Sequence, residues 1–273
     1  MNIYACPVCK EKLSLSGKSY ICPNNHSFDI AKSGYVNLLL SSGNGKQIHG
    51  DNKLMVKARR DFLEKGYYEK LLKGLCNVTS EYYESGKVIL DAGCGEGYYT
   101  NGIFERLSEK FDDVKICGID VSKIAVDIAS KKCKEVNYAV ASVFHLPVTD
   151  ESCDMVTTLF APFCREEIYR ILRKNGILLM VIPSERHLFG LKSAIYDEPY
   201  LNEVKDYHID DFEFTKSERI SYEIQLDNNL DIQNLFSMTP YYYKSGKKEQ
   251  AKIAEINELK TEVDFEILVY RKI

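Results

Sequence analysis

Short apolar runs alternate with segments of helical periodicity from about residue 87 onward. Helical segments lie between the runs, among them residues 98–111 and 123–133, and residues 165–175 precede the fifth run. Continuous apolar runs bounded by turn residues are typical of strands that are covered on both faces. Strands alternating with amphipathic helices predict an α/β fold with a mostly parallel, Rossmann-like sheet. The predicted strands are residues 87–93, 115–121, 137–143, 153–160 and 176–183.

The pattern changes at both ends of the chain. Residues 218–227 and 263–272 read as long strands, and we expect them to form an antiparallel edge at the C-terminal side of the sheet. In residues 53–75 the apolar positions have helical spacing, which Gly66 interrupts, so two helices are expected there. Residues 41–53 are polar and rich in glycine, which predicts a linker or a mobile loop.

Four metal-ligand residues stand close together near the N-terminus. Cys6 and Cys9 form a C-x2-C pair, and Cys22 and His26 form a C-x3-H pair. Three thiolates and one imidazole suit a tetrahedral Zn²⁺ ion, and four protein ligands leave no open position for catalysis. We therefore expect one structural zinc ion held between small strands; an iron–sulfur cluster or unrelated cysteines are the alternatives. The other six cysteines lack such pairing and are expected to be core or loop thiols.

Charge is unevenly distributed along the chain. The formal net charge is −4, yet residues 1–75 carry 12 basic and 6 acidic side chains, which leaves 24 basic and 34 acidic side chains for the remainder. The N-terminal part therefore has a net charge of +6 and the remainder −10. This asymmetry favours an N-terminal module that binds a polyanion and is joined to an ordinary globular domain. A solvated basic surface without a partner would give the same charge count.

Composition predicts a protein of the cytoplasm. Hydrophobic residues make up 45% and charged residues 28% of the chain, and no apolar run has the length that crosses a bilayer. The first residues lack the pattern of an export signal. Nine cysteines is an odd number, which favours reduced thiols with some metal ligation over a disulfide framework.

A glycine-rich turn follows the first predicted strand. Asp91 precedes Gly93, Gly95 and Gly97, whose spacing is G-x-G-x-G and not the dinucleotide-binding G-x-G-x-x-G. A carboxylate at this place would repel a pyrophosphate but could accept hydrogen bonds from the α-ammonium group of S-adenosylmethionine. Asp120 ends the second strand, where acidic residues take ribose hydroxyls in nucleoside sites. NAD binding, or a tight turn without a ligand, remains the alternative.

Residues 144–156, FHLPVTDESCDMV, resemble the loop before strand four in class I methyltransferases. The combination of this loop with Asp91, the glycines and Asp120 favours S-adenosylmethionine as the cofactor. Ser142 follows the third strand, and we expect it to lie near the adenine of this cofactor.

Together these features resemble the large-subunit ribosomal RNA (guanine-N1)-methyltransferases. The resemblance rests on the zinc knuckle followed by FDIAKSGYVNLL, on ARRDFLEKGYY, DAGCGEGYYT and MTPYYYK, and it covers nearly the whole chain. It implies zinc ligation by Cys6, Cys9, Cys22 and His26, and cofactor contacts by Tyr68, by Glu96 with the adjoining Gly95 and Gly97, and by His187. It also implies a homodimer with a shared cleft for a hairpin of 23S ribosomal RNA. The family's YAP sequence after strand four is Phe160, Ala161 and Pro162 here, so this position lacks the phenolic hydroxyl.

The resemblance divides the chain into three parts. Residues 1–40 are expected to form a zinc-binding RNA-recognition domain, residues 41–80 a linker and helices, and residues 81–273 the methyltransferase domain. Lysines 10, 12, 18 and 32 are expected to contact phosphates, and Arg59 and Arg60 to extend that track or to form surface ion pairs.

The expected reaction is transfer of a methyl group to N1 of a guanine that is unpaired or flipped out of its helix. Guanine N1 carries a proton near neutral pH, and the sequence identifies no base to remove it. Glu166 and Glu167 are better explained as solvated helix residues. Two alternatives stay open: a methyltransferase for a small molecule or a protein with a purely structural zinc clip, and a non-catalytic RNA-binding protein.

Overall fold

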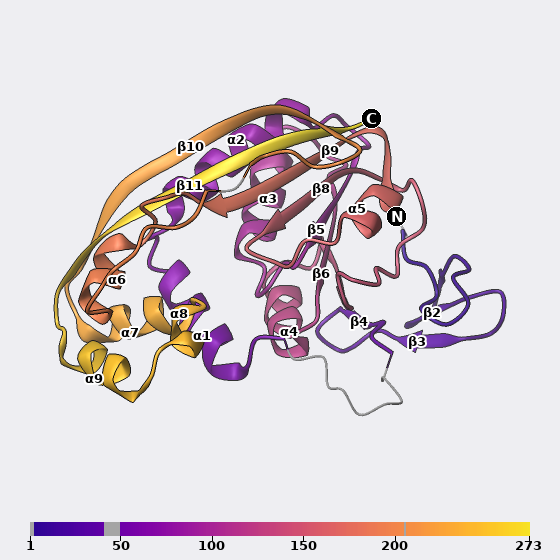
Figure 1. The fold of residues 1–273 in the computed structure, drawn as a ribbon. Helices are drawn as coiled ribbons and strands as arrows, with labels where there is room; N and C mark the ends of the chain where they lie inside the picture. Colours follow the sequence, from indigo (N-terminus) through magenta and orange to yellow (C-terminus); the bar gives the residue numbers. More distant parts are fainter. Residues whose placement is uncertain (1–2, 41–49, 205) are drawn as a thin grey trace.

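The computed structural model describes residues 3–40, 50–204 and 206–273 and has an eight-stranded sheet at its centre (Figure 1). The strand order is β10-β11-β9-β8-β5-β6-β7-β4, with parallel pairing from β9 to β4 and antiparallel pairing of β9, β11 and β10. The mostly parallel sheet with an antiparallel C-terminal edge is therefore confirmed. No helix in the described residues is long and apolar enough to cross a membrane.

All five predicted central strands are present. They are β5 (Val88–Ala92), β6 (Lys115–Asp120), β7 (Asn137–Val140), β8 (Cys153–Leu159) and β9 (Leu172–Pro183). The intervening helices are α3 (Tyr98–Ser108), α4 (Lys123–Lys132) and α5 (Arg165–Ile171). The helix predicted over residues 165–175 ends four residues early because Leu172 already pairs with Cys153 as the first residue of β9. Residues 141–152 connect β7 to β8 without a helix.

Two helices precede the central sheet, as the sequence predicts. They are α1 (Lys53–Leu63) and α2 (Glu69–Tyr82), and they are separated at Gly66, whose φ of +80° favours glycine. The side chain of Asn52 accepts a hydrogen bond from the backbone N–H of Met55 and so caps α1. Of the linker predicted over residues 41–53, residues 41–49 lie outside the described residues.

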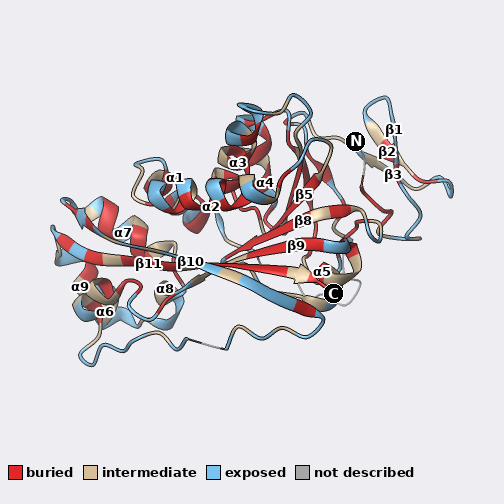
Figure 2. Cartoon of the chain, turned by 90° about the horizontal axis from the view of Figure 1, so that it is seen from above, coloured by how far each residue is buried: buried red, intermediate tan, exposed pale blue. Residues whose placement is uncertain are grey.

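The C-terminal part adds the long antiparallel edge and a group of helices that the sequence analysis did not predict. Strands β10 (Phe212–Leu226) and β11 (Leu259–Lys272) pair from Phe212 opposite Lys272 to Leu226 opposite Leu259. The helices are α6 (Phe189–Ile195), α7 (Asn229–Ser237), α8 (Tyr241–Lys244) and α9 (Lys247–Glu255). They gather at one end of the two long strands, beside α1 (Figures 1 and 2).

The N-terminal module is joined to the central sheet by main-chain hydrogen bonds. Its own small sheet consists of β1 (Ser14–Ser16), β2 (Ser19–Ile21) and β3 (Ser27–Asp29), and the following β4 (Val36–Asn37) pairs with β7. The backbone N–H of Ala5 donates to the Pro147 carbonyl at 2.9 Å, and that of Thr149 donates to the Ile3 carbonyl at 2.9 Å. Buried side chains of the module belong to the same apolar cluster as residues of β5 and β6. The module therefore shares a core with the sheet, while its β1 edge is exposed (Figure 2).

Candidate functional site

The four predicted zinc ligands converge at the base of the small N-terminal sheet. The ligand atoms of Cys6, Cys9, Cys22 and His26 all lie within 4.8 Å of one another. The Sγ atoms of Cys9 and Cys22 are 3.6 Å apart, and His26 Nδ1 lies 3.3 Å from Cys22 Sγ and 3.6 Å from Cys6 Sγ. Ligands about 2.1–2.3 Å from a tetrahedral zinc ion are separated by about these distances. The donor set and its spacing therefore fit one structural Zn²⁺ ion, which these four residues would hold.

The glycine-rich turn has a backbone that only glycine adopts easily. Gly93, Gly95 and Gly97 have φ angles of +93°, +54° and +83°. A Cβ atom on Gly93 would lie 2.3 Å from the Cβ atom of Ala161, because the segment after β8 packs directly on the turn. The G-x-G-x-G spacing is therefore required by the path of this turn and by its packing.

Asp91 is fully buried at the end of β5, next to the turn. Its carboxylate accepts hydrogen bonds from the hydroxyl groups of Thr100 at 2.5 Å and Thr157 at 2.8 Å. Burial raises the pKa of Asp91 to about 6, although the two hydroxyl groups oppose this shift. A carboxylate in so dry a place favours a cationic partner, which the α-ammonium group of the predicted cofactor would supply.

Asp120 and Ser142 lie at the carboxyl ends of the next two strands. The Asp120 carboxylate accepts from the backbone N–H groups of Gly95 at 3.0 Å and Ser122 at 2.7 Å, which fixes its orientation against the turn. Burial raises the pKa of Asp120. Ser142 is buried, and its Oγ accepts from the backbone N–H of Phe144 at 3.2 Å.

Arg59 of α1 forms ion pairs beside the glycine-rich turn. Arg59 Nη1 lies 2.5 Å from the Asp51 carboxylate and 3.9 Å from Oε2 of Glu96, the residue between Gly95 and Gly97. Glu96 is buried, which raises its pKa, and its Oε2 has no hydrogen-bond partner among the described residues. Arg59 therefore faces the glycine-rich turn and lines both cavities, and of the two roles expected for it the structure shows the ion pair. Arg60 pairs with Asp61 at 2.8 Å.

Two adjoining cavities lie over the carboxyl ends of the strands. The first has a volume of about 630 Å³ and is lined by Asp91, Gly93, Gly95, Glu96, Asp120 and Ser142, among others. The second has a volume of about 600 Å³, and its lining includes Tyr68 and His187. The residues shared by both linings are Asp51, Met55, Arg59, Tyr99, Phe160 and Tyr243.

The structure thus brings the predicted cofactor residues to two neighbouring places. Six of them line the first cavity, and Tyr68 and His187 line the second. Gly97 lines neither, because its Cα is packed against Ala129 and Tyr138, where a Cβ would meet atoms at 2.8 and 2.9 Å. Its role is to shape the turn at the start of α3.

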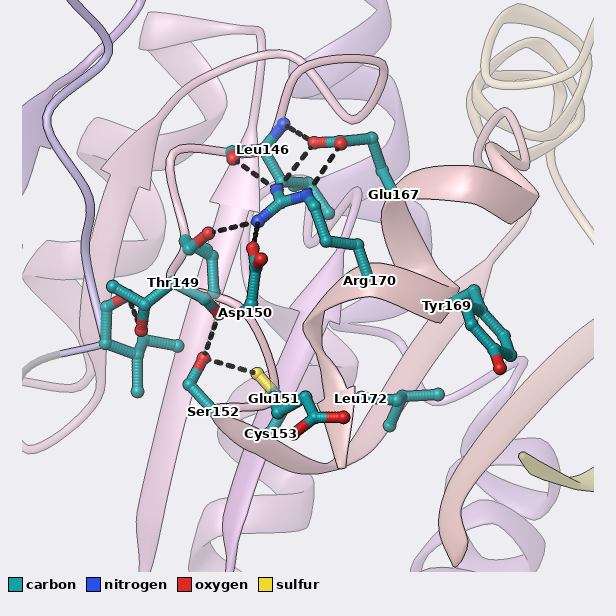
Figure 3. A network of polar contacts seen from close by, with 12 residues as sticks. Leu146, Thr149, Asp150, Glu151, Ser152, Cys153, Glu167, Tyr169, Arg170 and Leu172 are labelled. Carbon is teal, nitrogen blue, oxygen red and sulfur yellow. Dashed lines mark hydrogen bonds and ion pairs between the residues drawn. The ribbon is translucent and has the colours of Figure 1, made fainter. Parts of the chain in front are cut away.

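A polar network around Arg170 fixes the segment after β7 (Figure 3). Arg170 of α5 donates to the carbonyl oxygens of Leu146 at 2.9 Å and Val148 at 2.7 Å, and to Asp150 at 2.7 Å. Glu167 accepts from Arg170 at 2.9 Å and from the backbone N–H of Leu146 at 2.5 Å. The clamped segment carries Ser142 at one end, and its Pro147 and Thr149 bond the N-terminal module. Glu166 and Glu167 line neither cavity.

Several residues of the two cavities were not identified from the sequence as site residues. Met55 comes from α1, Asp51 from the residues just before it and Tyr243 from α8, and no motif marks Asp51 or Met55. The Tyr243 hydroxyl contacts Met55 Sδ at 2.7 Å and accepts from Asn52 at 3.0 Å, which joins α8 to α1. The MTPYYYK motif contains Tyr243 and could have identified it as a site residue. Its contact with α1 depends on how α8 packs, which the motif does not show.

Comparison with known protein families matches two parts of the chain. Residues 4–40 match the family described as "RlmA, N-terminal", and residues 83–258 match a "Methyltransferase domain" family. The first match coincides with the zinc cluster and β1–β4, and the second contains the glycine-rich turn and the strands from β5 to β10.

Two curated relatives are similar over nearly the whole chain. YxjB of Bacillus subtilis (strain 168), by name a candidate 23S rRNA (guanine-N(1)-)-methyltransferase, is 30% identical over 99% of this chain and 98% of its own length. The 23S rRNA (guanine(748)-N(1))-methyltransferase of Streptomyces fradiae is 32% identical over 92% of this chain and 90% of its own length. Among solved structures, the YcgJ protein of Bacillus subtilis has a TM-score of 0.51 at 14% identity, covering 76% of this chain and 99% of its own. That likeness concerns the fold alone.

Proposed function

Because this chain belongs to the family of 23S rRNA (guanine-N(1)-)-methyltransferases, we propose that it transfers a methyl group from S-adenosylmethionine to N1 of a guanine in 23S ribosomal RNA. One observation supports this activity above the others. A cavity formed by Asp91, the glycine-rich turn and Asp120 opens beside a second cavity of similar volume. A cofactor and an acceptor base can therefore lie side by side in one site.

The first cavity is the place for the cofactor. When bound, S-adenosylmethionine supplies an electrophilic methyl group on a sulfonium centre. Asp91 would accept from the α-ammonium group, Gly93 and Gly95 would let the backbone approach closely, and Asp120 would accept from the ribose hydroxyls. Ser142 lies on the side of Asp120 where the adenine would follow. Tyr68 and His187, in the adjoining cavity, would contact the cofactor at the methionine end.

Orientation supplies much of the rate in such a transfer. The two cavities share lining side chains and therefore adjoin. A base in one cavity would face a cofactor in the other across a short distance. N1 of guanine lies on the pairing edge of the base, and a base paired inside a helix cannot present that edge to a cavity of the protein. The enzyme would therefore act on a guanine that is unpaired or flipped out.

The zinc module is proposed to bind the RNA backbone. Lysines 10, 12, 18 and 32 are all exposed on it, and within the described residues none of them forms an ion pair. Unpaired basic side chains on a rigid surface suit phosphate contacts. The zinc ion would hold this surface in shape, since so small a sheet has little core of its own.

Two further features rest on the family resemblance. We propose a homodimer in which both chains face one RNA cleft, to be checked by light scattering at concentrations around the Kd of the RNA. We also propose that the protein acts in the cytoplasm, where ribosomal RNA is available as substrate.

The function is tested by digestion of the RNA product to nucleosides. Unmodified 23S ribosomal RNA is incubated with the protein and methyl-labelled S-adenosylmethionine, and the labelled nucleoside is identified by mass spectrometry. Label in 1-methylguanosine is the expected result. Label in another nucleoside, or label only in a small molecule or protein added as competitor, would contradict it.

A further inference from the structure

Lys192 of α6 is a fully buried lysine. Its exposed fraction is 0%, and within the described residues no carboxylate forms an ion pair with it. Lysines are almost never fully buried unless they are paired, because removing an ammonium group from water is unfavourable. Burial lowers the pKa of Lys192, and the charge of Lys244 adds to this shift. Other contacts of the ammonium group must therefore offset its burial.

The ammonium group of Lys192 is held by two other segments of the chain. Its Nζ donates to the backbone carbonyl of Tyr200 at 3.0 Å and to Oδ1 of Asn202 at 2.6 Å. It also lies 4.4 Å from the centroid of the Tyr200 ring and 5.5 Å from that of the Tyr241 ring. Contacts between a cation and an aromatic ring are strongest where water is excluded. Lys192 therefore joins α6 to the segment that follows it and to α8, which begins with Tyr241.

Asn202 connects the lysine to the turn after β9. An ammonium group only donates hydrogen bonds, so the amide oxygen of Asn202 must face it and the amide nitrogen must point the other way. That nitrogen donates to the carbonyl oxygens of Ser184 at 2.8 Å and His187 at 3.3 Å. The backbone N–H of Asn202 donates to the carbonyl of Glu185 at 2.8 Å. Three hydrogen bonds from one residue thus hold the turn that carries His187.

The groups that Lys192 holds belong to the wall of the second cavity. Asn202, Tyr241 and His187 line that cavity together with Tyr68. Lys192 itself lines neither cavity, so it lies behind this wall and cannot touch a ligand in front of it. Its effect on a ligand must pass through the residues that it holds.

We propose that Lys192 is a positioning residue for the methionine end of S-adenosylmethionine, because it fixes Asn202 and Tyr241 and thereby the turn that carries His187. This inference rests on the proposed function, which places that end of the cofactor beside Tyr68 and His187. Groups that contact a ligand are effective only when a second layer of hydrogen bonds holds them in place. Lys192 supplies that layer at this wall of the cavity.

The contacts of Lys192 predict a selective effect on the cofactor. The adenosine part would lie in the first cavity against Asp120 and Ser142, and no contact of Lys192 reaches either residue. Loss of the ammonium group should therefore weaken binding of the amino-acid part and leave binding of the nucleoside part unchanged. A general loss of structure would weaken both parts equally.

The ligand 5′-methylthioadenosine separates these two effects, because it contains the nucleoside and the sulfur of the cofactor but no amino-acid part. Lys192→Met keeps the length of the side chain and removes its charge. By calorimetry of the full chain without RNA, its Kd for S-adenosylmethionine should rise about 10–100-fold, the factor expected for loss of a hydrogen bond to a charged group. Its Kd for 5′-methylthioadenosine should change less than threefold. Lys248→Met, at an exposed lysine of α9 that pairs with Asp197, is the control and should change neither Kd.

A second variant tests whether Lys192 acts through Asn202. Asn202→Ala should weaken S-adenosylmethionine selectively as well, and the double variant should be no weaker than the more affected single variant. Independent, additive effects would overturn this connection. Urea titration shows whether each variant is folded, and if Lys192→Met is not, Asn202→Ala gives the same comparison of the two ligands.

The ratio of the two Kd values decides the inference. An equal loss of affinity for both ligands, or an unchanged Kd for S-adenosylmethionine, would overturn the positioning role even in a protein that labels guanine normally. Failure of the proposed function has a different signature. In that case the unaltered protein would not bind S-adenosylmethionine, or would bind it and label no guanine.

Discussion

Arg59 of α1 holds its guanidinium 3.9 Å from the buried Oε2 of Glu96, inside the glycine-rich turn. Both residues line the first cavity, and Asp51 completes the group at 2.5 Å from Arg59. Because Glu96 has no other partner for Oε2 among the described residues, the arginine is the group that offsets the burial of this carboxylate.

Arg59→Ala should therefore destabilise the folded chain. Loss of the arginine leaves Glu96 buried and uncompensated, and we expect the free energy of unfolding to fall by about 1–3 kcal/mol in urea titrations. Arg60→Ala is the matched control, since Arg60 pairs with its half-buried neighbour Asp61, and it should change the free energy by less than about 1 kcal/mol. In the Arg59→Ala background, Glu96→Gln should restore stability; additive effects of the two substitutions would show that the residues are not coupled.

Asp91 should make stability depend on pH. Its pKa is raised by burial to about 6 from an unfolded value near 4, so between these values the folded state binds more protons than the unfolded state. The contribution of Asp91 to stability therefore falls as pH rises from about 4 to 6. Asp91→Asn should be more stable than the unaltered chain at pH 7, by up to about 3 kcal/mol, with no difference near pH 4.

The same substitution should weaken cofactor binding, because an amide cannot attract the α-ammonium group as a carboxylate does. His187 titrates with the opposite sign, since its pKa is lowered to about 3, but it is present in both proteins and cancels in the difference. Unfolding in urea at pH 4.5, 5.5 and 7 gives the comparison. A constant difference across this range would show that Asp91 is not the titrating group.

We expect one zinc ion per chain. We also expect it to stabilise residues outside the N-terminal module as well as the module itself. Cys22→Ser should lower the zinc content, measured by atomic emission, from about one ion per chain to near zero. Since Ala5 and Thr149 make main-chain hydrogen bonds across the two parts, amide exchange should also become faster around residues 147–149. Cys164→Ser is the control, because Cys164 lies outside the cluster. Zinc retained in Cys22→Ser would mean that another ligand set binds the metal.

Arg170 should be the residue that holds the segment between the cofactor cavity and the zinc module (Figure 3). Arg170→Ala removes bonds to Leu146, Val148, Asp150 and Glu167, and we expect a loss of about 1–3 kcal/mol in the free energy of unfolding. Amide exchange of residues 146–149 should increase as well. Arg173→Ala, on the first residues of β9, breaks an exposed ion pair with Asp154 and should leave this segment unchanged.

The sheet and the zinc cluster could be predicted from the sequence because their signals are local. Buried parallel strands are continuous apolar runs, and metal ligands have short, regular spacings. Gly93, Gly95 and Gly97 mark the turn because their backbone angles exclude other residues.

The rest of the site depends on how elements that are distant in the chain pack together. Arg59 was placed on a surface, although it faces the glycine-rich turn, because spacing along a helix does not say what the helix packs against. The second cavity joins Phe160 to residues of α8, and no local pattern reports that contact. The docking of the zinc module uses the main chain of Ala5 and Pro147, which leaves no side-chain signature.

The central claim is methylation of N1 of a guanine in 23S ribosomal RNA, and primer extension across the hairpin tests it most directly. A methyl group on N1 blocks pairing, so reverse transcriptase should stop one nucleotide before a single guanine after treatment with the protein and S-adenosylmethionine. The stop should be lost without the cofactor and greatly reduced with Asp120→Ala. Read-through at every guanine, in RNA that has demonstrably bound the cofactor-loaded protein, would contradict the assignment.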